Sequence, residues 1–226
     1  MNYNKKQHKN EFFFQLDVTE EQVRFAKELV DYSIKNHPVT DIFSCDPMGK
    51  ERQREFRFTG TLGEVVFADT YNLPRPTRSF GAIDGQDFGQ DFVLNIGGER
   101  KSFDIKTMKR KNNHFRANYV LNLPSYQMFR EGVVTDFYFC ISIHYNGKNW
   151  VASMLGYISK NEIQNGHIGI LYKKGSRRIK DDGDSFIFQR DTYEVDFKDI
   201  CSPFINDEIE KTTGFLRKTL LPAFHN

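Results

Sequence analysis

Charged side chains interrupt two apolar runs in the sequence DFVLNIGGERKSFDIKT, which spans residues 91–107. Asp91 opens the first run, whereas Asp104 and Lys106 lie inside the second. A pair of glycines separates the runs, which predicts a β-hairpin of strands 91–96 and 100–107. A tight turn of this kind would bring the charged side chains together, and a cluster of this composition could perform chemistry.

Side chains alternate between the two faces of a strand, so Asp104 and Lys106 share one face of the predicted hairpin. Phe103 and Ile105 share the other face and are candidate core residues. The simplest interpretation is a structural salt bridge, which contributes less than about 1 kcal/mol when it is exposed.

Further carboxylates near the hairpin favour a metal site. Glu64 lies upstream on a predicted helix, and Asp84 and Asp87 in the glycine-rich loop are rivals of Asp91. Carboxylates that converge repel one another and need a cation. A small set of oxygen ligands suits Mg²⁺, for which Mn²⁺ can substitute. A lysine beside such an ion can orient a water or stabilise charge on a phosphate.

This constellation resembles the PD-(D/E)xK nuclease superfamily, which has the restriction-endonuclease-like fold. The matching residues are Asp91, then twelve residues, then Asp104-Ile105-Lys106, with Glu64 on the preceding helix. The similarity covers roughly residues 59–107, and Gln90 stands where the family has a proline before the first aspartate.

The resemblance implies a Mg²⁺-dependent deoxyribonuclease, of the restriction type or the phage type. Asp91 and Asp104 would hold the ion, Glu64 would hold a second ion or a metal-bound water, and Lys106 would position the attacking water. Double-stranded DNA is the implied partner. A homodimer is expected because cleavage of both strands needs two sites.

Four basic residues follow the hairpin and are predicted to contact phosphates: Lys109, Arg110, Lys111 and Arg116. Two other basic clusters, around 52–57 and 173–180, are more typical of solvated surfaces. His114 and His144 have no partner at a catalytic spacing, so we expect surface or structural roles for both.

The remaining patterns predict an α/β protein with a central mixed β-sheet flanked by helices. The predicted helices begin at a capping box of Thr19 and Gln22, at residue 59, after Pro124, at a second capping box of Ser159 and Glu162, and at 206. A loop and a short strand are expected over 44–58. The predicted strands beyond the hairpin lie at 135–145 and 149–159, joined by an Asn-Gly turn, and within 167–174, 185–190 and 192–197.

Length and composition fit one domain over residues 1–226, with a flexible lead over 1–10. The net charge of +2 gives no global argument for nucleic acid binding. Three separated cysteines, Cys45, Cys140 and Cys201, predict free thiols in the cytoplasm. No apolar stretch approaches about 18 residues, so no membrane partner is expected.

Two alternatives to the deoxyribonuclease stay open. A nucleic-acid-binding protein without catalysis would keep the hairpin as a salt-bridged support and would not need Mg²⁺. An RNA-processing nuclease or a nucleotide hydrolase would use the same carboxylates on a different substrate.

Overall fold

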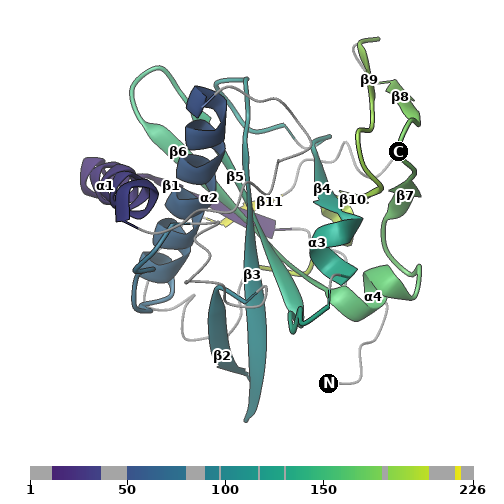
Figure 1. Cartoon of the computed structure of the whole chain (residues 1–226), viewed down its shortest axis with the longest axis horizontal. Coiled ribbons are helices and arrows are strands. Elements are labelled where there is room, and N and C mark those ends of the chain that lie inside the picture. The colour runs from purple at the N-terminus through teal and green to yellow at the C-terminus, as the bar shows by residue number, and fades with distance from the viewer. Residues whose placement is uncertain are drawn as a thin grey trace.

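A computed structural model describes residues 12–36, 50–79, 90–96, 98–116, 118–129, 131–179, 183–203 and 217–219. The predicted lead, Cys45, and the rival acids Asp84 and Asp87 lie outside these residues. Within them, the chain forms a mixed α/β architecture, which confirms the predicted fold class at that level (Figure 1). No helix among these residues has the length and apolar character to cross a membrane.

The main sheet has six strands in the order β11-β1-β6-β5-β3-β2. The pairing of β3 with β5 is parallel and the other pairings are antiparallel, so the sheet is mixed as predicted. Its strands are β1 (Phe12–Asp17), β2 (Phe92–Ile96), β3 (Glu99–Lys109), β5 (Phe137–Tyr145), β6 (Trp150–Ser159) and β11 (Arg217–Thr219).

Two long helices, α1 (Glu20–Asn36) and α2 (Lys50–Thr70), lie to one side of the main sheet (Figure 1). On the other side lie a three-stranded sheet in the order β4-β10-β7 and a two-stranded sheet of β8 and β9. These elements are β4 (Val120–Pro124), α3 (Ser125–Phe129), α4 (Lys160–Gln164), β7 (Ile170–Tyr172), β8 (Arg177–Ile179), β9 (Ser185–Ile187) and β10 (Thr192–Asp196).

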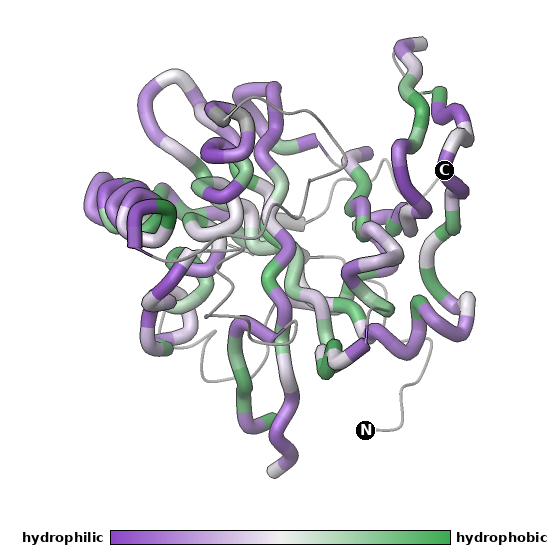
Figure 2. The backbone as a smooth tube through the Cα atoms, viewed as in Figure 1, coloured by the Kyte–Doolittle hydropathy of each residue, from purple (hydrophilic) through white to green (hydrophobic). Residues whose placement is uncertain are grey.

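Strand β5 is buried on both faces and separates two hydrophobic clusters. Phe139 and Ile141 pack into the first cluster, together with residues of α1 and α2. Tyr138 and Cys140 alternate with them and pack into the second cluster, which includes residues of β4 and β10. The hydrophobic stretches of the tube accordingly run through the centre of the molecule (Figure 2). This central strand therefore joins the two sides of the protein.

The predicted start of the first helix is confirmed. The Thr19 hydroxyl accepts a hydrogen bond from the Gln22 amide at 3.1 Å, and the Gln22 side chain accepts one from the Thr19 amide at 2.9 Å. The second predicted capping box is wrong, because Ser159 makes no side-chain hydrogen bond to α4. The same spacing therefore gives a cap only where the local geometry allows both side chains to accept hydrogen bonds from the backbone amides at the start of the helix.

The expected loop and short strand before residue 59 are wrong at residues 50–58, where α2 is continuous. The segment is rich in Lys, Glu, Arg and Gln, which are strong helix formers. The closing helix predicted from residue 206 is also wrong at residues 217–219, which form β11 against β1; the rest lies outside the described residues. The strands β1, β4 and β8 were not predicted.

Candidate active site

The predicted hairpin is confirmed, with β2 paired to β3 from Phe92 opposite Phe103 to Ile96 opposite Glu99. Asp91 stands where β2 begins. Its amide donates to the Phe103 carbonyl at 2.7 Å, and its Oδ2 atom accepts a hydrogen bond from the Ile105 amide at 2.6 Å. Its carboxylate is therefore held against the backbone of β3, next to Asp104.

The predicted division of faces on β3 is also confirmed. Phe103 and Ile105 are buried in the first hydrophobic cluster, against α2. Asp104 and Lys106 point to the opposite face, where Lys106 Nζ lies 2.7 Å from Asp104 Oδ2. The two side chains are only 12% and 16% exposed, so this ion pair is largely removed from water. It is not the exposed salt bridge of the simplest interpretation.

Two residues of β5 form the wall behind this ion pair. Tyr138 pairs with Asp104 across the strands, and Cys140 pairs with Lys106. The Lys106 ammonium lies 5.7 Å from the centre of the Tyr138 ring, a cation–π arrangement. Burial, reinforced by the charge of Asp104, raises the pKa of Tyr138 well above its ordinary value. Burial likewise raises the pKa of Cys140, so this thiol is not an activated nucleophile.

Glu64 lies on α2 and is buried, with 7% of its surface exposed. Gly63 brings α2 so close to β3 that a Cβ atom at this position would stand 1.7 Å from Thr107 Oγ1. Other residues of α2, among them Val65 and Val66, pack with Phe103 and Ile105 in the first hydrophobic cluster. Among the described residues, no three His, Cys, Asp or Glu side chains are grouped closely enough to hold a metal ion. The structure thus brings Asp91 and Asp104 together without Glu64.

The four predicted phosphate-binding residues have different environments. Lys109 forms an ion pair with Glu55. Arg110 donates hydrogen bonds to Ser142 Oγ at 2.9 Å and to the Val120 carbonyl at 3.2 Å, and burial lowers its pKa to about 10. Lys111 and Arg116 are exposed. Arg116 Nε also donates a hydrogen bond to His114 Nε2 at 3.4 Å, so three of the four residues are engaged by the protein itself.

The other basic clusters are also partly matched by acids. Arg54 pairs with Asp31, Lys173 pairs with Asp191, and Arg178 pairs with Glu194. His144 is buried, and His114 is exposed beside Asn113. The residue that sequence reasoning missed is Tyr138, which sits behind the Asp104–Lys106 pair. Tyr138 lies in the apolar run 137–145, and the hydrophobicity of this run led us to assign all of it to the core.

Comparison of the chain with known protein families, with curated proteins and with solved structures yields no match. The resemblance to the PD-(D/E)xK superfamily therefore rests on the motif residues themselves. The chemistry open to the site follows from its groups: two adjacent carboxylates, one ammonium and a protonated phenol at the start of a hairpin.

Proposed function

We propose that this chain is a metal-dependent nuclease that hydrolyses phosphodiester bonds in DNA at the β2–β3 hairpin. The observation that carries the proposal is the placement of Asp91 and Asp104 side by side, with Lys106 held 2.7 Å from Asp104. The restriction-endonuclease-like fold, the cytoplasmic location and a homodimer that cuts both strands belong to the same proposal.

The donor set fits a hard divalent cation. Asp91 and Asp104 supply carboxylate oxygens, which Mg²⁺ and Mn²⁺ prefer, and two such ligands leave coordination positions for water and phosphate. Bound there, Mg²⁺ would lower the pKa of a water and offset charge on the phosphoryl oxygens. Glu64 would join Asp91 and Asp104 as a ligand if the binding of substrate or metal moved its side chain to the edge of β3.

Lys106 has the central catalytic role in this proposal. Its ammonium pairs with Asp104 and neutralises that carboxylate. A cation on Asp104 would take over that neutralisation, and the Lys106 ammonium could then donate a hydrogen bond to the attacking water or to a phosphoryl oxygen. The Tyr138 ring behind it limits the directions in which the ammonium can move. The low exposure of the pair strengthens these electrostatic contacts, because little water screens them.

One observation favours the non-catalytic alternative. Asp104 and Lys106 form a largely buried ion pair, as a structural pair in a nucleic-acid-binding protein would. An RNA substrate is a further alternative, which competition between DNA and RNA would separate.

The deciding experiment incubates the purified chain with plasmid DNA, with Mg²⁺ or with a chelator. We expect cleavage that needs the metal and is abolished by Lys106→Ala. The matched control is Lys101→Ala, because Lys101 lies on the same strand and also pairs with a carboxylate, Glu99, at 2.7 Å. Parental cleavage by Lys106→Ala would exclude the hairpin as the active site. Metal-independent DNA binding without any cleavage would favour the non-catalytic alternative.

A further inference from the structure

The face of β3 that carries the candidate catalytic residues continues to a second polar site. Alternation places Asp104, Lys106 and Met108 on one face of β3. Arg110 follows directly after the strand, where its amide donates a hydrogen bond to the Ile143 carbonyl of β5 at 2.7 Å. Met108 packs against the second hydrophobic cluster, and Arg110 bonds to Ser142 on the neighbouring strand. At roughly 3.3 Å per residue, Arg110 lies about 13 Å from Lys106 along the strand. This distance corresponds to about four stacked nucleotides at about 3.4 Å each.

A cavity of about 280 Å³ opens at Arg110, bounded by the residues that follow β3 and by parts of β4, β8, β9 and β10. Three guanidinium groups line it, from Arg110, Arg116 and Arg178. Its one carboxylate, Glu194, is bound by Arg178 at 2.9 Å. Three positive charges and one negative charge leave the lining with a net charge of +2, so the cavity favours an anion.

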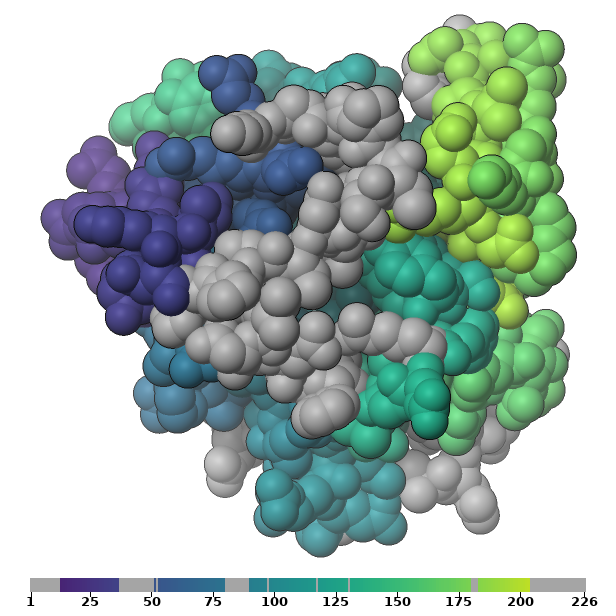
Figure 3. Space-filling model, viewed as in Figure 1, coloured from purple at the N-terminus to yellow at the C-terminus, as the bar shows by residue number. Residues whose placement is uncertain are grey.

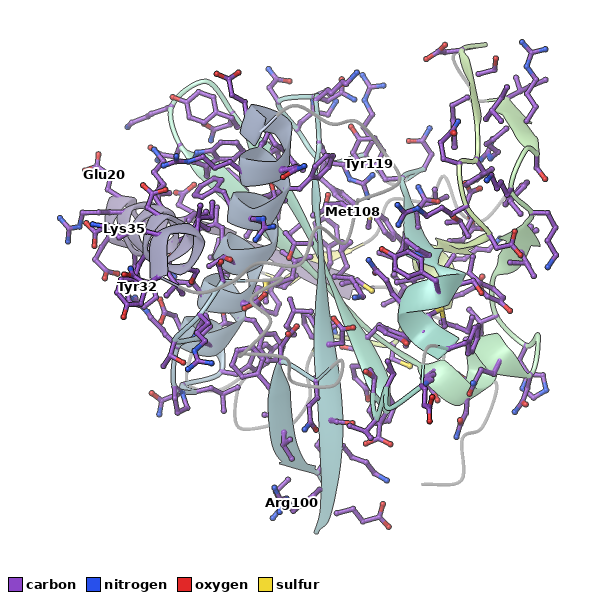
Figure 4. All side chains as sticks on the ribbon, in the orientation of Figure 1. Glu20, Tyr32, Lys35, Arg100, Met108 and Tyr119 are labelled. Carbon is purple, nitrogen blue, oxygen red and sulfur yellow. The ribbon has the colours of Figure 1, made fainter. Side chains whose placement is uncertain are left out.

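The same cavity carries groups that recognise nucleobases. Tyr119 and Phe186 contribute aromatic rings, and three asparagine side chains contribute amides: Asn112, Asn118 and Asn122. Arg110 lies 4.4 Å from the centre of the Tyr119 ring, so guanidinium and ring hold each other in place. Met108 and Tyr119 both border the second hydrophobic cluster and lie between β3 and β4 (Figure 4). Aromatic rings stack on bases, and amides pair with base edges.

We infer that this cavity binds one nucleotide of a polynucleotide whose backbone continues to Lys106, an inference that rests on the proposed nuclease function. The phosphate would contact Arg116 at the rim, and the base would enter between the aromatic rings and the amides. A volume just below the usual range for ligand pockets fits a single nucleotide rather than a longer segment. Arg110 is a positioning residue, because it is half-buried, bonds to Ser142 and lies against the Tyr119 ring.

The test measures binding in the presence of a chelator, so that cleavage does not interfere. The full chain is titrated with each deoxynucleoside 5′-monophosphate, with the nucleosides and with inorganic phosphate, and the asparagine side-chain amides are followed by NMR. We expect at least one nucleotide to bind about fivefold or more tightly than either its nucleoside or phosphate alone. Arg116→Ala and Asn122→Ala should each weaken that binding, the former by about tenfold.

The matched control is Arg177→Ala, because Arg177 is the exposed neighbour of Arg178 on β8 and does not line the cavity. It should bind like the parental chain. Equal affinity for phosphate and nucleotides, or equal losses in Arg116→Ala and Arg177→Ala, would overturn the inference. Plasmid cleavage without nucleotide binding would refute nucleotide binding by this cavity and leave the nuclease proposal standing. Nucleotide binding without cleavage would refute the nuclease proposal alone.

Discussion

At the scale of single residues, the burial of the Asp104–Lys106 pair decides how the hairpin behaves. Both members are largely shielded from water, whereas the Glu99–Lys101 pair on the same strand has the same 2.7 Å contact and is far more exposed. Removing one partner of a buried pair leaves the other charge uncompensated, which is costly. Two ion pairs of equal length on one strand therefore have different consequences.

The Asp104→Asn substitution should destabilise the metal-free protein by about 3 kcal/mol, because the Lys106 ammonium loses its buried partner. It should also abolish the rise in Tm that Mg²⁺ produces in the parental chain by binding the folded state. Thermal unfolding with and without millimolar Mg²⁺ measures both effects.

The control for this prediction is Glu99→Gln, which should change the stability by less than about 0.5 kcal/mol, since exposed pairs contribute little. Its Mg²⁺ response should match that of the parental chain. An Mg²⁺-induced rise in Tm that survives in Asp104→Asn would place the ion elsewhere.

At the scale of elements, the two capping motifs offer a matched comparison. Thr19 and Gln22 exchange hydrogen bonds at the start of α1, whereas Ser159 makes none at the start of α4. Thr19→Ala should therefore cost about 1 kcal/mol in the free energy of unfolding. Ser159→Ala should cost almost nothing, and chemical denaturation of both variants measures the difference. Equal losses would mean that the hydrogen bonds of Thr19 do not stabilise α1.

The contact between α2 and β3 gives a second prediction at this scale. In an unhindered helix, Gly→Ala stabilises by about 1 kcal/mol. Gly63→Ala should instead destabilise the protein, because its Cβ atom would stand 1.7 Å from Thr107 Oγ1 and 2.7 Å from Thr107 Cβ. Adding Thr107→Ala removes the closest atom, Oγ1, together with Cγ2, and should recover part of the loss. Additive effects in denaturant unfolding would argue against this contact.

At the scale of the whole molecule, the two sides of the main sheet are joined through β5 and through a contact on β6. Figure 3 shows α1 at one end of the molecule and the strands β7–β9 at the other. The segment after β10 returns to β6, where Tyr157 and Cys201 exchange backbone hydrogen bonds at 2.8 and 3.2 Å. Gly156 lies against the Cys201 carbonyl, so the segment after β10 contacts β6 at a residue that has no side chain.

Gly156→Ala should therefore destabilise the protein strongly, by about 3 kcal/mol or more. Its φ of +121° favours glycine, and the added Cβ atom would stand 1.7 Å from the Cys201 carbonyl oxygen. Gly147→Ala is the control, because that residue has a φ of +97° but nothing within 4 Å of the added atom. It should cost only about 1–2 kcal/mol for the backbone conformation. Denaturant unfolding compares the two variants. Equal losses in the free energy of unfolding would show that the Cys201 segment can move away from Gly156 without destabilising the protein.

Features that depend on neighbouring residues could be predicted from the amino-acid sequence. The hairpin, the alternation of faces on β3, the cap at Thr19 and the Asn-Gly turn are all local, because turn chemistry and strand periodicity act within a few residues. The candidate pair Asp104 and Lys106 followed from that alternation. The strand β4 went unrecognised because it lies in a polar connection and is fixed by pairing with β10, far along the chain.

Which charges meet and which are buried depends on the packing of segments that are far apart in the chain. The packing of α2 against β3 through Gly63 and Thr107 joins residues 44 positions apart, and no local pattern encodes that contact. Arg110 was predicted to contact phosphate, but it is half-buried and bonds to β4 and β5 through acceptors 10 and 32 positions away along the chain. Burial and long-range contacts depend on how distant segments pack, and this dependence is the physical reason why the sequence alone could not supply them.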